Sequence, residues 1–143
     1  MNQREMKERT KQFALKVIKL VNALPKNIQG QAIAKQLIRS GTSVGANYRS
    51  ACRGRSKAEF IAKLGIVEEE ADESAFWMEL IIEEGLLEKE LVEPLLTEAD
   101  QLVAILVASR KSAKTNLTNT KSHMKNRKPK IVSGKPQAVN RKS

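Results

Sequence analysis

The stretch RSGTSVGANYRSACRGR, residues 39–55, decides the fold; in it, small residues stand between four arginines. A run of this composition often forms a loop, because glycine and serine are common turn residues. Here the residues suited to a core face favour a helix instead, because they recur at alternating spacings of three and four. They are Ala34, Leu37, Gly41, Val44, Tyr48 and Ala51. We therefore predict a helix over residues 29–53 that continues through Gly41 and Gly45.

These two glycines need a structural reason inside a helix. Each destabilises an isolated helix by about 1 kcal/mol relative to alanine. Gly41 and Gly45 lie one turn apart on nearly the same face, so close approach of a neighbouring helix would offset this loss. The segment is not a phosphate-binding loop, because no Gly-Lys-Ser/Thr sequence follows the first glycine at the required spacing.

Two more helices flank this one in the prediction. The first covers residues 3–24 and ends before Pro25, because the residue before a proline is pushed out of the helical region. The other covers residues 57–84 and ends at Gly85. It begins at a capping box, in which Ser56 accepts from the first turn and Glu59 reaches back to the backbone of Ser56.

A fourth helix is predicted to begin near residues 91–94 and to fray between residues 112 and 120. Four amphipathic helices with short connections are typical of an antiparallel up-and-down four-helix bundle. We predict an all-α bundle over residues 1–119. Residues 120–143 are predicted to form a disordered basic tail, because they are rich in lysine and arginine and poor in apolar side chains.

Charge is distributed unevenly along the chain. Residues 1–63 hold fourteen basic and three acidic side chains, whereas residues 64–109 hold one basic and thirteen acidic side chains. Residues 110–143 hold eleven basic side chains and no acid. The first two segments are expected to neutralise each other on folding; alternatively, their unlike faces meet between subunits. The acid-free segment is expected either to be simply solvated or to attract nucleic acid in a strongly salt-dependent way.

No catalytic, metal or cofactor site is predicted, so an enzyme is not expected. His123, the only histidine, lies in the tail, whereas a di-metal site in a bundle needs inward-facing histidines. Cys52 has no histidine in the bundle to activate it and is expected to be a small buried residue beside Gly45. A single cysteine and a charged N-terminus are typical of a cytoplasmic protein. The longest apolar run, residues 102–108, is too short to span a membrane.

The arginines of the opening stretch allow two interpretations. Arg49 lies beside the predicted core face and is expected to form an ion pair with the third helix. The candidate partners are Glu69, Glu70, Asp72 and Glu73. Arg53, Arg55 and Lys57, near the helix end, either form similar pairs or contact phosphate groups. The remaining candidates for nucleic-acid binding lie in the tail: Lys121, Lys125, Arg127, Lys128 and Lys130.

Residues 36–82 resemble the bacterial four-helix-bundle family of proteins encoded in 23S ribosomal RNA intervening sequences. The flanking segments FALKVIKLVNALP and LLTEADQLVAILVASRKSAK are also similar to that family. The resemblance implies a ring-like homopentamer without a catalytic site. It further implies kinship with the accessory variability proteins of diversity-generating retroelements, which bind a reverse transcriptase and nucleic acid. The positions that match the family's motif, as packing and assembly residues, are Arg39, Ser40, Gly41, Gly45, Asn47, Arg49, Arg53, Glu70, Asp72, Ser74 and Trp77.

These observations together predict a cytoplasmic, homo-oligomeric bundle that associates with RNA or DNA, in particular ribosomal RNA. The alternative is a protein–protein adaptor of the retroelement kind. No membrane partner is expected.

Overall fold

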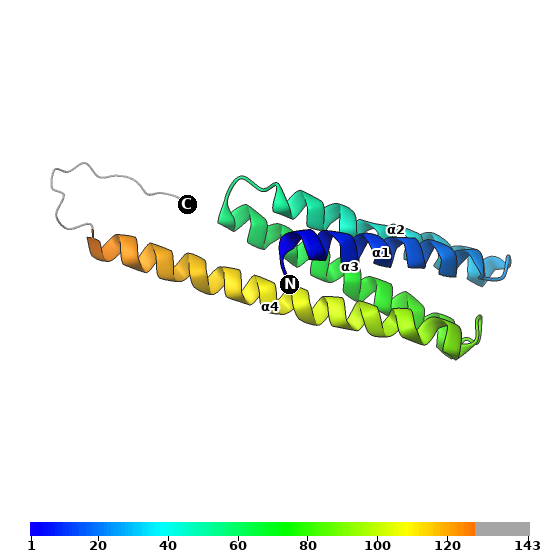
Figure 1. Ribbon diagram of the computed structural model, residues 1–143. Coiled ribbons are helices and arrows are strands. Elements are labelled where there is room, and N and C mark those ends of the chain that lie inside the picture. Colours follow the sequence, from blue (N-terminus) through cyan, green and yellow to red (C-terminus); the bar gives the residue numbers. More distant parts are fainter. Residues whose placement is uncertain (128–143) are drawn as a thin grey trace.

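The computed structural model describes residues 1–127, with side chains described through residue 122. Four helices make up this part of the chain: α1 (Gln3–Asn22), α2 (Ile28–Cys52), α3 (Lys57–Glu83) and α4 (Lys89–Arg127). Consecutive helices run antiparallel (Figure 1). The contacts join α1 to α2, α2 to α3 and α3 to α4 extensively, and α1 to α4 only sparsely. The predicted all-α four-helix bundle is confirmed.

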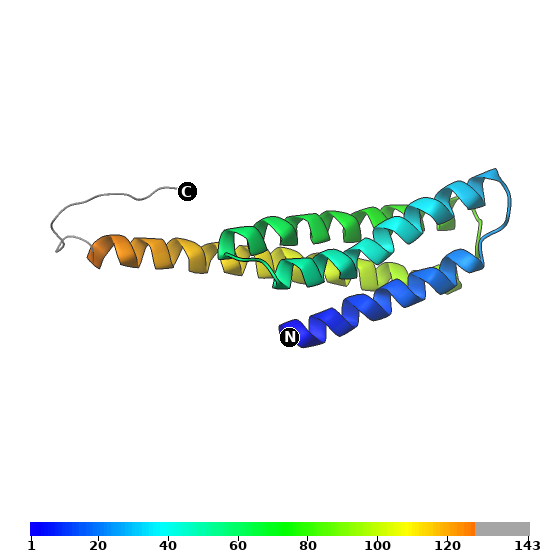
Figure 2. The ribbon, with the colours of Figure 1, turned by 90° about the horizontal axis from the view of Figure 1, so that it is seen from above.

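Sparse contact between α1 and α4 leaves one seam of the bundle partly open. Figure 2 shows that α1 diverges from the other helices toward its N-terminus. The core is nevertheless continuous, because the predicted apolar stripes face one another. Leu37, Val44, Leu64, Met78 and Leu102 are all fully buried. Their burial removes enough apolar surface from water to make this core the main stabilising element of the fold.

The ends of α3 follow from local sequence signals. The hydroxyl of Ser56 accepts a hydrogen bond from the Glu59 amide at 3.1 Å, as predicted. The Glu59 carboxylate, however, accepts from the amide of Arg55 at 2.6 Å instead of that of Ser56, so only half of the predicted capping box forms. At the other end, Gly85 has a φ of 65°, a left-handed conformation that glycine adopts without strain. The predicted end of the helix at Gly85 is confirmed.

The helix α2 does continue through Gly41 and Gly45, and both glycines lie against α1. A Cβ atom on Gly41 would stand 2.7 Å from a methyl group of Val17. A Cβ atom on Gly45 would stand 3.3 Å from the carbonyl oxygen of Thr10. The close helix approach expected at these glycines is therefore observed, and the helix concerned is α1.

A buried pair of hydroxyl groups joins α2 to α3. Ser74 Oγ lies 2.9 Å from Ser40 Oγ, and both side chains are fully buried. Ser74 Oγ also lies 2.9 Å from the carbonyl oxygen of Glu70 within its own helix. Buried hydroxyl groups need such partners, because water cannot reach them.

Replacing Ser74 with alanine is expected to destabilise the fold by about 1 kcal/mol, because the hydroxyl of Ser40 loses its partner across the helix interface. The double variant Ser40→Ala/Ser74→Ala is expected to lose less than the sum of the two single variants, since neither helix then buries an unmatched hydroxyl. Urea unfolding followed by the fluorescence of Trp77, the only tryptophan, measures all three. Strictly additive losses would contradict this account.

The helix α4 is longer than the sequence predicts. It continues to Arg127, past the range 112–120 in which fraying is expected, so the predicted boundary between residues 119 and 120 falls inside a helix. No glycine or proline occurs between Pro94 and Pro129 to stop it. Arg110 also anchors α4 to α3, with its guanidinium 2.8 Å from the Glu68 carboxylate. Residues 128–143, predicted to be disordered, lie outside the described part of the chain.

Candidate nucleic-acid interface

The basic residues near the end of the opening stretch lie at one end of the bundle. Here α2 ends at Cys52, a short turn follows, and α3 begins at Lys57. Arg53, Arg55 and Lys57 are all exposed at this turn. The long helix α4 passes the same end and extends beyond the other three helices (Figure 1). The fold therefore brings the α2–α3 turn next to the start of the extension of α4.

A cleft of about 740 Å³ lies between these elements. Its lining comes from the start of α1, the α2–α3 turn and α4, and consists of Gln3, Ala51, Cys52, Gly54, Arg55, Ser56, Lys57, Phe60, Ala108, Ser109, Ser112, Ala113 and Asn116. Among the described side chains, none that lines it is acidic. We refer to this feature as the end cleft.

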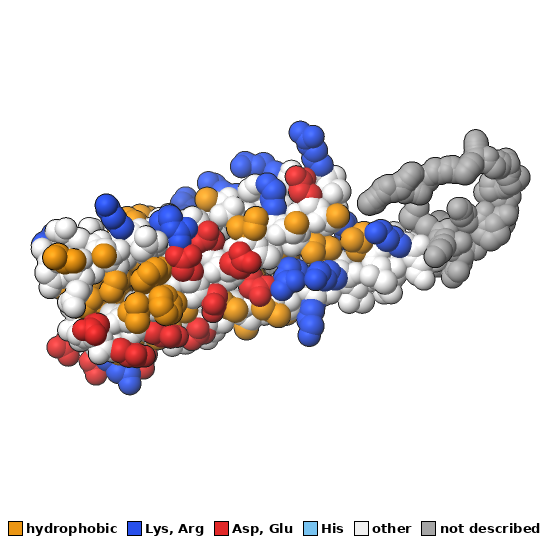
Figure 3. Space-filling view, turned by 180° about the vertical axis from the view of Figure 1, so that it is seen from behind, with side chains coloured by type: hydrophobic (Ala, Val, Ile, Leu, Met, Phe, Trp, Pro, Cys, Tyr) orange, Lys and Arg blue, Asp and Glu red, His pale blue; other side chains and the backbone are white. Residues whose placement is uncertain are grey.

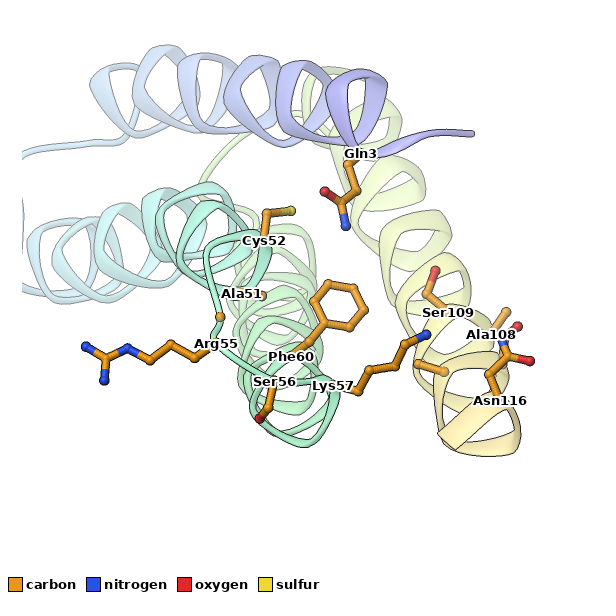
Figure 4. Close-up of a pocket in the computed structure, with 13 residues that line it drawn as sticks. Gln3, Ala51, Cys52, Arg55, Ser56, Lys57, Phe60, Ala108, Ser109 and Asn116 are labelled. Carbon is orange, nitrogen blue, oxygen red and sulfur yellow. The ribbon is translucent and has the colours of Figure 1, made fainter. Parts of the chain in front are cut away.

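Figure 4 shows how the labelled side chains are arranged around the end cleft. The ring of Phe60 projects into its centre, and the side chain of Gln3 points in from α1. Lys57 reaches across toward α4, whereas Arg55 points away from the cleft into solvent. The cleft thus combines an aromatic surface, amide and hydroxyl groups, and a cation on its rim.

Exposed lysines continue the positive charge along α4. Lys111, Lys114 and Lys121 are exposed on the part of α4 that follows the last buried core residue, Leu106. Within residues 1–122, none of these lysines, nor Arg53, Arg55 or Lys57, forms an ion pair with a carboxylate. We refer to these six residues as the basic end. Of the other predicted binding residues, the side chains of Lys125 and Arg127, and Lys128 and Lys130 entirely, lie outside the described residues.

The predicted ion pair between α2 and α3 forms at a different arginine. Arg49 is exposed and has no carboxylate partner among the described side chains, so its predicted role as an ion-pair anchor is wrong. Arg39 takes this role: its guanidinium lies 3.2 Å from Glu70 and also pairs with Glu73. The reason is rotational, because residue 49 turns toward the α1 side of α2, whereas residue 39 turns toward α3.

The pair between Arg39 and Glu73 links stability to pH. The Arg39 guanidinium, together with the indole N–H of Trp77 at 3.0 Å, lowers the pKa of Glu73 below its ordinary value of 4.5. A carboxylate whose pKa is lowered by folding stabilises the fold above the pKa of the unfolded chain. It loses this contribution as the pH falls through the lowered pKa.

The variant Arg39→Gln is therefore expected to be slightly less stable than the parent chain at pH 7. The effect is small because Arg39 is largely exposed. The difference is expected to shrink as the pH falls through the lowered pKa of Glu73, because the carboxylate is then protonated in both chains. Urea unfolding at pH 7, 5 and 3 measures it, with Arg49→Gln as the matched control. A difference that stays constant with pH would show that Glu73 is not involved.

Cys52 is less buried than predicted. Its thiol lies at the wall of the end cleft and is half-buried, because α1 diverges there and does not cover it. The neighbouring Tyr48, which occupies the predicted core face, is buried. This burial raises the pKa of its hydroxyl well above the ordinary value, with the nearby Cys52 thiol as a second cause.

Several residues of this region are not predicted from the sequence. Phe60 lies four residues before the buried Leu64 on α3, yet it is only half-buried and faces the end cleft. Ser109, Ser112 and Asn116 line the cleft because α4 stays helical beyond residue 112. Lys114 belongs to the acid-free segment and lies in the range 112–120 in which the prediction has the helix fray, whereas the structure keeps it on α4. The absence of glycine and proline between Pro94 and Pro129 is the signal that would have extended the predicted helix over this range.

The described residues offer neither a metal site nor a membrane span. No group of three or more histidine, cysteine, aspartate and glutamate side chains in this part of the chain is arranged to hold a metal ion. None of the helices there is both long and apolar enough to cross a membrane.

Comparison with known proteins places the bundle in a family. A family model described as 23S rRNA-intervening sequence protein matches residues 2–108. A crystal structure from Bacteroides thetaiotaomicron, described as a protein with unknown function from the S23 ribosomal protein family, is similar with 33% sequence identity and a TM-score of 0.69. The similarity covers 73% of this chain and 97% of that one. No curated protein matches. The chain belongs to the 23S rRNA-intervening sequence protein family.

Proposed function

We propose that this protein is a non-enzymatic, self-associating cytoplasmic bundle that binds RNA through its basic end. The observation that carries the proposal is the group of six exposed cations on the α2–α3 turn and on α4, which lack carboxylate partners within residues 1–122. Phosphate groups are the usual partners of such clusters. The description of the matching family supports ribosomal RNA as the target.

The extension of α4 suits contact with a phosphate backbone. From Leu117 to Arg127 the helix runs beyond the residues that line the end cleft, a length of about 16 Å at 1.5 Å per residue. Lys114 and Lys121 fall within about 20° of each other at 100° per residue, and both are exposed. A helix with cations along one side can follow a backbone of regularly spaced negative charges.

Fluorescence anisotropy with a labelled 23S ribosomal RNA stem-loop, repeated across salt concentrations, tests the proposal. Log affinity is expected to fall linearly with log salt. A chain that ends after Thr120 keeps every buried core residue and is expected to bind more weakly with a shallower slope. Lack of salt-sensitive binding by the full chain at low ionic strength would rule the proposal out.

Self-association is proposed because exposed apolar side chains occur on two oppositely charged faces. Ile66 and Phe76 are 44% and 49% exposed on the acidic helix α3. Leu15 and Ile38 are 44% and 38% exposed on the lysine-rich pair α1 and α2. Figure 3 shows orange apolar side chains among red acidic ones on one face of the bundle. Unlike faces that meet head to tail can close a ring, and the family resemblance favours a pentamer.

Light scattering on the purified protein tests this assembly. A particle of five chains is expected at micromolar concentration, and a monomer there would rule out the ring. The same faces also favour the second candidate function, an adaptor whose partner is another polypeptide, as in retroelements. A defined protein recovered by pull-down after nuclease treatment would support the adaptor, whereas recovery of RNA alone from untreated lysate would count against it.

A further inference from the structure

The end cleft contains an aromatic ring, which contact with phosphate groups does not need. Phe60 sits on the stripe of α3 that faces the core, but it lies where α1 diverges from α4. The ring therefore packs against the core on one side and faces the cleft with the other (Figure 4). An aromatic ring held in this way offers a flat surface at low entropic cost, since its rotamer is already fixed by packing.

The rest of the lining provides polar groups for the edge of a base and a cation for a phosphate. Gln3 from α1 and Asn116, Ser109 and Ser112 from α4 carry amide and hydroxyl groups, which both donate and accept hydrogen bonds as the edge of a base requires. Lys57 lies on the rim, where it can contact a phosphate group. Within residues 1–122, the lining contains no acidic side chain that would repel a phosphate.

We propose that the end cleft binds one unpaired nucleobase of an RNA strand, stacked on the ring of Phe60, while Lys57 contacts the adjacent phosphate. This proposal rests on the proposed RNA association and specifies its substrate as single-stranded or bulged RNA. The end cleft, of about 740 Å³, has room for one nucleoside. Bases inside a duplex are stacked on each other, so only an unpaired base can reach the ring.

The proposal is tested with two labelled single strands of twelve nucleotides, one of adenosines and one of the same length in which every base is absent. Both carry the same phosphates, so their difference isolates the base. The parent protein is expected to bind the adenosine strand about tenfold more tightly, as one stacked base implies. The variant Phe60→Leu keeps an apolar side chain against the core and is expected to bind both strands equally, with unchanged affinity for the strand without bases.

Two further variants separate stacking from folding. Ile28→Ala, which removes an exposed apolar side chain at the start of α2, at the opposite end of the bundle, is the control and is expected to bind as the parent does. Ser112→Leu places an apolar side chain in the cleft from the exposed side of α4, away from the core, and is expected to abolish the difference between the strands. The fluorescence of Trp77 monitors folding in every variant.

The outcomes distinguish the two proposals. Equal affinity of the parent for both strands, or an undiminished difference in Phe60→Leu, would overturn the base site while salt-sensitive binding of the strand without bases still supports the basic end. Failure to bind either strand at low salt would overturn both. Binding of a polypeptide partner that Phe60→Leu weakens, with no effect on RNA, would instead assign the cleft to a protein.

Discussion

A chain in which Lys111, Lys114 and Lys121 are all replaced with glutamine is expected to bind RNA roughly 10²–10³-fold more weakly at 50 mM salt. Each lysine that contacts a phosphate displaces condensed counterions, and this release drives binding at low salt. Removing three contacts should make the plot of log affinity against log salt shallower by about two to three. The three side chains are exposed and follow the last buried core residue, so stability should change little.

The matched control for this variant replaces Lys16, Lys19 and Lys26 with glutamine. These lysines are also exposed, and replacing them removes the same charge. They lie toward the opposite end of the bundle from the α2–α3 turn. The control is expected to keep the salt dependence of the parent chain. An equal loss of affinity in both triple variants would mean that net charge, and not the basic end, attracts RNA.

Replacing Gly41 with leucine is expected to destabilise the bundle by about 3 kcal/mol or more, the upper end of losses from overpacking. A Cβ atom alone would stand 2.7 and 2.8 Å from the two methyl groups of Val17. Val17 is fully buried and β-branched, so it cannot rotate away. The helix α1 must then move off α2, which opens the core around Val17.

A milder series isolates this contact. Gly41→Ala is expected to lose about 1–2 kcal/mol, because the clash exceeds the gain of about 1 kcal/mol in helix propensity. Gly65→Ala is the matched control on α3: its Cβ would meet only Arg110 Cδ at 3.9 Å, so a gain of up to about 1 kcal/mol is expected. Combining Gly41→Ala with Val17→Ala should lose less than the sum of the two, as urea unfolding can measure. Full stability of Gly41→Leu would mean that α1 does not approach α2 there.

The periodicity of apolar residues predicted most of the fold. The stripe that contains Leu37, Val44 and Tyr48 is buried as expected, because a spacing of three and four defines one face of a helix. Spacing does not tell which neighbour that face meets. The sequence therefore indicated close approach at Gly41, whereas the partner, Val17 on α1, became known only from the structure.

The candidate site was predicted less completely, again because the sequence does not tell which neighbouring helix a given face meets. The sequence identified Arg53, Arg55 and Lys57 because they lie at a helix end, and a helix end is marked by residues close by in the sequence. The ion pair was assigned to Arg49 instead of Arg39, since a rotation of one helix against another decides which arginine faces α3. The half-buried position of the Phe60 ring depends on the divergence of α1, which no local pattern encodes.

The continuity of α4 between the core and its extension has a thermal consequence. A helix in isolation must first form a costly nucleus, whereas residues beyond Leu106 add to turns that the core already holds. Threonine and asparagine recur between residues 115 and 120, and both are weak helix formers. The extension should therefore unwind gradually from its free end on warming, well before the bundle melts. The number of cations held on the helix then falls as the temperature rises, while the core of the bundle stays folded.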